Sequence, residues 1–428
     1  MEDYSALLKL DAVDDPVHLD LAWFQAHVNV DIQDPPQILH DHIVWGRFAT
    51  LVPVQLKTLK GQELVVMIKR VVPDELPGIE HYEPFIASAK REMYFYRDEV
   101  EPGDDLFPHI YASLEREVNG KPAFILVMEE VKRLGYTHIK KATESMQIEQ
   151  ALATLARLNS GHRLAASVAR FVAYGERHSD EIRIDASTID NERGGFWVLA
   201  RRPELEIKNA AQEWASFLER FQEFLPEKIL NMPDLSKLGQ RLAEIAPDLE
   251  DVVRQRSYAL IHGDAKSWNL FYPRHDPHAP VKLIDMQWKG YGHPLQDFVY
   301  FMTTSVDPEL LKDPHCWRCY LAFFRGLLVA HLDAGHVRRA ANYREIILCS
   351  SLDDFEALAD IVWLDYVRVI ALGLWRRLDP AKQEANAQKI GISLVTGSVE
   401  QMYWILEHAL KLLASPTKML APILEKHI

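Results

Sequence analysis

The residues best suited to chemistry lie in the stretch His262-Gly263-Asp264-Ala265-Lys266-Ser267-Trp268-Asn269 and, further along, at Asp285. Asp264 and Asn269 have the D-x-x-x-x-N spacing of a kinase catalytic loop, in which the aspartate acts on the acceptor hydroxyl and the asparagine binds a metal ion. Asp285 ends an apolar run, where a second carboxylate would hold Mg²⁺ bridging the phosphates. The pattern predicts phosphoryl transfer from ATP to an alcohol, with Asp264 as base and Asn269 and Asp285 as ligands of Mg²⁺.

This stretch resembles the aminoglycoside phosphotransferase and choline kinase superfamily, whose signature is a strand, H-G-D, four residues, Asn, a hairpin and a strand ending in Asp. Asp285-Met286-Gln287 and then Gly292-His293-Pro294-Leu295-Gln296-Asp297-Phe298-Val299-Tyr300 are similar to the D-x-Q and G-x-P-x-x-D-h-x-Y of its ecdysteroid kinase-like branch. The resemblance implies a two-lobed protein-kinase-like fold, with ATP and Mg²⁺ between the lobes.

Two residues nearer the N-terminus extend the resemblance. The run Val65 to Ile68 alternates onto Lys69 as in the V-A-I-K strand of kinases, so Lys69 is expected to contact the α- and β-phosphates. Lys90-Arg91-Glu92-Met93-Tyr94-Phe95-Tyr96 resembles the R-E-x-x-F-Y helix of the family, which makes Glu92 the expected partner of Lys69.

Two further segments are expected to contact the nucleotide. Val44 to Thr50 lies where the resemblance places the phosphate-covering loop, with a single glycine, Gly46, and with the backbone amides of Phe48 and Ala49 reaching the phosphates. Phe124 to Glu130 resembles the hinge, where backbone groups near Met128 to Glu130 would hydrogen-bond to adenine.

Other polar residues near the motif have expected roles outside the chemistry. His262 and Asp297 are expected to support the loop backbone, and Gln287 to steady the metal site. Lys266 has two readings, because it could stabilise the transferring phosphoryl group or be a solvated lysine. Four tryptophans could shape an acceptor pocket, but aromatic residues at helical spacing are more often in the core, and they are assigned to the core here: Trp268, Trp288, Trp363 and Trp375.

The periodicity of apolar residues changes near residue 130, from mainly strand-like before it to mainly helical after it. Before it, β-type runs at Leu51 to Leu56 and Leu64 to Ile68 are joined by a turn at Lys60-Gly61, Phe124 to Met128 is a third run, and Glu83 to Val100 has helical spacing. After it, strand-like runs occur only around the motif, at Ala259 to Ile261, Leu270 to Tyr272 and Val281 to Ile284. The remaining patterns are helical: Ser145 to Asn159, Ala210 to Phe224, Leu235 to Ala246, Cys316 to Ala334, Ala340 to Leu348, Asp354 to Leu372 and Val399 to Leu413.

We therefore predict an α+β protein of two lobes. Residues 1–128 form a small β-rich N-lobe that binds the nucleotide, and residues 129–428 form a larger α-helical C-lobe with the catalytic loop, the metal site and the acceptor-binding helices. The net charge of −14 argues against a nucleic-acid partner, because clustered positive charge is the usual footprint of such surfaces.

The composition also bears on location and metals. No apolar stretch is long enough to span a bilayer, and Met1-Glu2-Asp3 begins without a secretory signal, so a cytoplasmic location is expected. Cys316 and Cys319 form a C-x-x-C without a second ligand pair, so zinc is not expected. Oligomeric state is not readable, because an apolar helix face fits a core and an interface equally well.

Two questions stay open on the sequence. The same fold could hold a nucleotide or small molecule without transfer, as a pseudokinase-like binding module, although the expected catalytic and metal-binding residues are present. The acceptor is expected to be a small-molecule alcohol, and steroid-like, aminoglycoside-like, choline-like and sugar acceptors all fit, because pocket residues come from scattered helices. A protein kinase is disfavoured, because Met286-Gln287-Trp288 follows Asp285, so that no D-F-G is formed, and no A-P-E follows.

Overall fold

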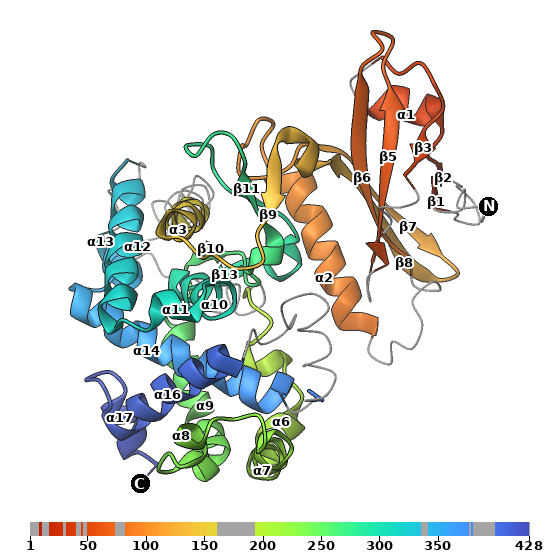
Figure 1. The fold of residues 1–428 in the computed structure, drawn as a ribbon. Helices are drawn as coiled ribbons and strands as arrows, with labels where there is room; N and C mark the ends of the chain where they lie inside the picture. Colours follow the sequence, from red (N-terminus) through yellow and green to blue (C-terminus); the bar gives the residue numbers. More distant parts are fainter. Residues whose placement is uncertain are drawn as a thin grey trace, which may run out of the picture. The chain divides into compact units, whose positions relative to one another are not determined.

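The computed structural model describes residues 8–10, 17–28, 31–39, 44–45, 49–72, 82–160, 193–334, 341–375, 378–379 and 399–427 (Figure 1). The chain divides into two compact units. Unit 1 comprises Met1–Thr137 and Phe271–Trp288, and unit 2 comprises His138–Leu270 and Lys289–Ile428. Unit 1 thus extends past residue 128 and takes in a later stretch of chain, which a contiguous division of the sequence does not anticipate.

The main sheet of unit 1 is antiparallel, with the order β3-β5-β6-β8-β7 and with β4 paired to β5. The predicted hairpin is confirmed, because β5 (Thr50–Lys57) and β6 (Glu63–Val71) pair across a turn in which Gly61 has a φ of +74°. The other strands are β3 (Gln37–Ile38), β4 (Val44–Trp45), β7 (Ile110–Val118) and β8 (Lys121–Glu129). A separate short pair is formed by β1 (Lys9–Leu10) and β2 (Val17–His18).

Alternation along β6 sorts its side chains onto the two faces of this sheet. Val66 and Ile68 belong to a core cluster that includes Phe24 of α1 (Leu21–His27). Val71 packs on the opposite face with Ala89, Met93 and Phe124. Ala89 and Met93 lie on α2 (Tyr82–Tyr94), which continues as a π-helix over Phe95–Glu99. The predicted helix is thereby confirmed. Lys69 is two residues from Val71 and therefore lies on the α2 face.

A second, three-stranded sheet of order β12-β11-β9 leads to Asp285. Its strands are β9 (Tyr136–His138), β11 (Leu270–Pro273) and β12 (Lys282–Leu283). The Leu283 amide donates to the Leu106 carbonyl at 2.7 Å, and Lys282 donates to the Phe107 carbonyl at 2.9 Å. These bonds attach the segment before Asp285 to unit 1.

Unit 2 is mainly helical and carries the loop His262 to Asn269, the predicted catalytic loop, after a short strand. β10 (Ala259–Ile261) pairs with β13 (Gly290–Gly292), and α10 (Pro294–Ser305) follows. α14 (Leu352–Val369) is buried along most of its length and packs against α9 (Leu238–Arg254), α10 and α16 (Val399–Ala414). The other α-helices among the described residues of unit 2 are α3 (Ser145–Ser160), α6 (Glu204–Lys208), α7 (Ala210–Phe221), α8 (Glu227–Leu230), α11 (Pro308–Leu311), α12 (Pro314–Ala334), α13 (Ala341–Leu348) and α17 (Ala421–Glu425).

The expected sheet-rich N-terminal part and helical C-terminal part are thus confirmed. One predicted helix end is wrong, because α9 does not stop at Ala246 but continues through Pro247 to Arg254. Its apolar stripe continues beyond the proline, where Leu249 and Val253 are buried, and this packing offsets the lost backbone hydrogen bond. Trp363 and Trp375 are fully buried, as expected of core residues, whereas Trp268 and Trp288 are only half-buried and do not belong to the core.

The cysteine pair lies on α12, where Cys316 is half-buried and Cys319 is exposed. Within the described ranges, no three His, Cys, Asp or Glu side chains group as a metal-binding set would. No helix in the described part of the chain is both long enough and apolar enough to cross a membrane.

Candidate active site

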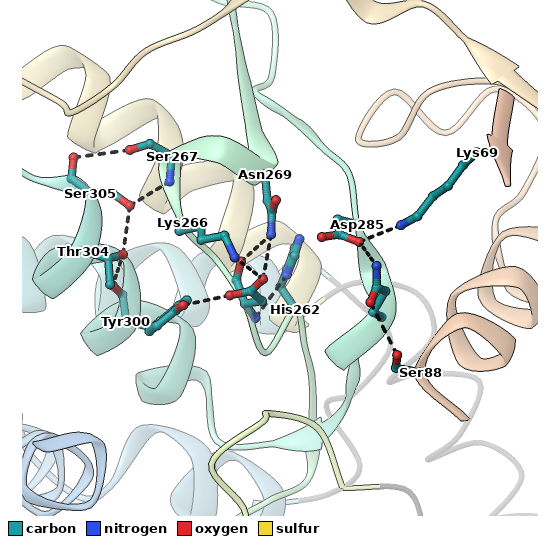
Figure 2. A network of polar contacts seen from close by, with 12 residues as sticks. Lys69, Ser88, His262, Lys266, Ser267, Asn269, Asp285, Tyr300, Thr304 and Ser305 are labelled. Carbon is teal, nitrogen blue, oxygen red and sulfur yellow. Dashed lines mark hydrogen bonds and ion pairs between the residues drawn. The ribbon is translucent and has the colours of Figure 1, made fainter. Parts of the chain in front are cut away.

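Unit 1 brings together the lysine and both carboxylates that the sequence assigns to the nucleotide and its metal. Figure 2 shows the contact of Lys69 with one of them, Asp285. The Lys69 Nζ atom lies 2.6 Å from Glu92 Oε2 and 2.8 Å from Asp285 Oδ1. The predicted pairing of Lys69 with Glu92 is confirmed. The second contact, to Asp285, is one that the sequence does not reveal, because the two residues are 216 positions apart.

This cluster fixes the charge on the lysine. Burial alone would lower the pKa of Lys69, but the carboxylates of Asp285 and Glu92 outweigh it and raise the pKa well above its ordinary value. Burial raises the pKa of Glu92 to about 7, although the attraction of Lys69 opposes this rise. Lys69 is therefore a constant cation, which suits a contact with phosphate.

Asp285 is held in a strained backbone conformation. Its φ of 64° lies in the left-handed region, which residues other than glycine seldom adopt. Its Oδ1 atom accepts from Lys69 and, at 2.5 Å, from Nε2 of Gln287. The Ser88 hydroxyl in turn donates to Oε1 of Gln287 at 3.4 Å. Strain of this kind persists where surrounding contacts enforce it and concentrates at functional sites. Gln287 holds the Asp285 carboxylate, and its expected role in steadying a metal site stays a prediction.

The phosphate-covering loop is described in part. Gly46 and Phe48 lie outside the described residues. Ala49 is half-buried and packs against the α2-face cluster of Val71, Ala89, Met93 and Phe124. Its contact with phosphate through the backbone amide stays a prediction.

The hinge segment leaves β8 with some of its backbone already engaged. Met128 pairs with Met67 of β6. The Glu130 amide donates to the Val65 carbonyl at 3.3 Å, and the Glu130 side chain caps the 3-10 helix Val131–Leu134. A base that accepted the Glu130 amide would have to displace Val65. The contact of adenine with Met128 and Glu130 stays a prediction. Because the Glu130 amide already bonds to Val65, backbone groups of the segment other than this amide would have to bond to the base.

In unit 2, three side chains converge on the carboxylate of Asp264 (Figure 2). The Tyr300 hydroxyl donates to Oδ1 at 2.8 Å. Lys266 Nζ and Asn269 Nδ2 donate to Oδ2 at 2.6 and 3.0 Å. Asp264 is buried, so these donors fix the direction of its carboxylate.

Asn269 is oriented by the same network. Its Nδ2 atom donates to the backbone oxygen and to Oδ2 of Asp264, at 2.9 and 3.0 Å. The carboxamide oxygen is thereby directed away from Asp264, and no donor among the described residues contacts it. Carboxamide and carboxylate oxygens are ligands that Mg²⁺ prefers. The donor chemistry of Asn269 and that of Asp285 each fit the predicted metal.

The backbone of the catalytic loop is fastened by Asp297. Its carboxylate accepts from the amides of His262 at 2.8 Å and Gly263 at 2.9 Å, and from Nδ2 of Asn159 at 3.0 Å. Gly263 has a φ of 75°, which explains the glycine of the motif. His262 is fully buried, and its Nδ1 atom accepts from the Asp264 amide at 3.3 Å. The expected supporting roles of Asp297 and His262 are confirmed.

The structure bears on one of the two hypotheses for Lys266, that of a solvated lysine. Its ammonium forms an ion pair with Asp264 at 2.6 Å, and 29% of its side chain is exposed. Lys266 is therefore not a freely solvated lysine. Its charge lies within the network of the loop, and its contact with the transferring phosphoryl group stays a prediction.

Sequence reasoning assigned no role to Asn159 or Tyr300. Tyr300 had a signal, since it closes the motif that ends in D-h-x-Y. Asn159 had none, because it lies at the end of α3, 138 residues before Asp297, and only packing brings the two together.

The chain is similar to one known protein family. The model of the ecdysteroid kinase-like family matches residues 87–333, which is more than half of the 428-residue chain. The sequence matches none of the curated proteins.

Several solved structures are similar at low identity. A Plasmodium vivax ethanolamine kinase is 11% identical, with 91% of this chain and 83% of that chain covered and a TM-score of 0.37. A choline kinase from Streptococcus pneumoniae is 11% identical, covers 92% and 98%, and has a TM-score of 0.37. A macrolide 2′-phosphotransferase from Brachybacterium faecium is 11% identical, covers 82% and 97%, and has a TM-score of 0.32. At this level of similarity nothing about the activity of this chain follows from them.

Proposed function

Because the chain belongs to the ecdysteroid kinase-like family, we propose that it is an ATP- and Mg²⁺-dependent kinase of small molecules, which phosphorylates a hydroxyl group. The observation that carries the proposal is the Asp264 carboxylate, buried and held by Tyr300, Lys266 and Asn269. Three donors on one carboxylate give it a fixed direction, which is what a base needs to meet one hydroxyl of an acceptor.

In the proposed reaction Asp264 accepts the proton of the acceptor alcohol. The alcohol oxygen forms a bond to the γ-phosphorus, and the bond from that phosphorus to the bridging oxygen breaks, so that ADP leaves. Lys69, held by Glu92, positions the phosphates with a constant positive charge. Asn269 and Asp285 are the proposed ligands of Mg²⁺, which when bound neutralises charge on the phosphates.

The first experiment asks whether the chain binds nucleotide and transfers phosphate. Thermal unfolding is measured with and without Mg-ATP, and ADP release is then measured with choline, glucose, kanamycin and ecdysone as separate acceptors. Stabilisation and acceptor-dependent ADP release are expected. Stabilisation without ADP release on any alcohol would favour the binding module without transfer.

The second experiment tests the base. Asp264→Asn keeps the shape of the side chain, so Mg-ATP is expected to stabilise the variant as it does the wild type. Acceptor-dependent ADP release is expected to fall by about 10³-fold, because the proton has no acceptor. Asp276→Asn, in an exposed turn, is the matched control and should keep full activity. If Asp264→Asn released ADP at the wild-type rate, Asp264 would not be the base.

A further inference from the structure

The two oxygens of the Asp264 carboxylate are not equivalent. Each carboxylate oxygen has about two lone-pair sites. In the part of the chain that the structure describes, Oδ2 accepts from Lys266 and Asn269, whereas Oδ1 accepts from the Tyr300 hydroxyl alone. Oδ1 is therefore the oxygen that keeps a site for an incoming proton, and Tyr300 is its one partner among these residues.

Helix α10 holds Tyr300 in register with the catalytic loop. Asp297 accepts from the amides of His262 and Gly263, and the Ser305 hydroxyl accepts from the amide of Ser267 at 2.7 Å. Tyr300 lies between Asp297 and Ser305 in the sequence of the helix and contacts Asp264, which lies between the anchored Gly263 and Ser267 in the sequence of the loop. Figure 2 shows the contact of Ser305 with Ser267. One helix therefore sets both the backbone of the loop and the direction of its carboxylate.

The ring of Tyr300 cannot move without disturbing its neighbours. Its centroid lies 5.5 Å from that of Phe196, 5.4 Å from that of Trp197 and 5.6 Å from that of Tyr366. The carbonyl of Trp197 accepts from Arg368 at 2.9 Å, which anchors that side of the cluster. Tyr300 is 8% exposed, so its hydroxyl is confined to the side of Oδ1.

The hydroxyl of Tyr300 acts as a donor in this contact. Burial, and then the charge of Asp264, raise the pKa of Tyr300 well above its ordinary value. The phenol keeps its proton at neutral pH. It therefore supplies a hydrogen bond to the carboxylate without adding charge.

We propose that Tyr300 is a positioning residue, whose hydroxyl holds the Asp264 carboxylate so that Oδ1 receives the proton of the acceptor alcohol. The proposal rests on the proposed function. In this step the acceptor O–H bond breaks and its proton passes to Oδ1, while the acceptor oxygen bonds to the γ-phosphorus and ADP departs. Tyr300 keeps its own proton throughout.

The test compares Tyr300→Phe with Tyr366→Phe. Both substitutions remove one buried hydroxyl from the same aromatic cluster and leave the ring, but of these two hydroxyls only that of Tyr300 donates to Asp264. ADP release is measured with Mg-ATP and with choline, glucose, kanamycin or ecdysone. Tyr300→Phe is expected to lower kcat by about 10- to 100-fold, the size expected for a hydrogen bond to a charged group. The KM for ATP should stay unchanged, and Tyr366→Phe should keep kcat within about twofold.

Crystal structures of the wild type and of Tyr300→Phe give a readout that does not depend on turnover. The Asp264 carboxylate of the variant is expected to be rotated or to occupy two orientations. An unchanged orientation, or a kcat equal to that of Tyr366→Phe, overturns the proposal. If the wild type releases no ADP with any of the alcohols, the proposed function fails, and the orientation of Asp264 still decides the positioning role.

Discussion

Acidification is expected to destabilise the chain through the buried imidazole of His293. Its Nδ1 atom accepts the amide of Leu295 at 3.2 Å, and its Nε2 atom lies 3.0 Å from the carbonyl oxygen of Ile347, an arrangement that fits the neutral ring with its proton on Nε2. Burial lowers the pKa of His293 to about 3 from an ordinary value of 6.5. Because His293 begins α10, its protonation also acts on the helix that carries Asp297 and Tyr300.

The size of the effect follows from the difference in proton binding between the two states. The unfolded chain binds a proton at this ring below pH 6.5, whereas the folded chain does so only near pH 3. The contribution to stability is therefore complete above pH 6.5 and is lost as the pH falls toward 3. Each pH unit in this window is worth about 1.4 kcal/mol. Acidification from pH 7 to pH 5 should lower the free energy of unfolding by about 2 kcal/mol through this ring alone.

Urea unfolding at pH 7 and at pH 5 measures this loss. His293→Asn keeps an N-cap residue but cannot be protonated. Its free energy of unfolding should therefore fall between pH 7 and pH 5 by about 2 kcal/mol less than that of the wild type. His278→Asn, at an exposed position, is the matched control and should lose as much stability as the wild type. An equal loss in His293→Asn and in the wild type would refute the reasoning.

Three further substitutions test the elements around the site. Asp297→Asn turns an amide donor toward the backbone N–H groups of the loop, so urea titration should show a loss of about 2 kcal/mol, and ADP release should disappear. Lys69→Met leaves two carboxylates without their cation, and a loss of about 3 kcal/mol is expected, together with a smaller thermal shift on addition of Mg-ATP. Gly292→Ala would place a Cβ atom 2.4 Å from Cδ1 of Ile261. The resulting overpacking beneath the catalytic loop should cost about 1–3 kcal/mol in urea titration, and an unchanged unfolding midpoint would contradict it.

Much of the fold could be predicted from local sequence patterns, and the exceptions have physical causes. The β5–β6 hairpin and α2 were predictable because each has a regular apolar period bounded by turn residues. Strand β7 (Ile110–Val118) was missed, because it lies at the edge of the sheet, is only half-buried and carries charges, so its alternation is weak. The family indicated by the motif of the loop is confirmed by the match over residues 87–333.

Local motifs were enough to predict Asp264, Asn269, Lys69 and Glu92 as members of the candidate site. The spacing from Asp264 to Asn269 is contained in one short loop, and the pairing of Lys69 with Glu92 follows from two motifs, so neither depends on knowing how distant segments pack. How the Asp264 carboxylate is held depends on tertiary packing. Tyr300 reaches Asp264 across 36 residues, and Asn159 reaches Asp297 across 138. The donors around a buried carboxylate are brought there by the packing of whole helices. That packing joins residues far apart in the sequence, so no local motif predicts it.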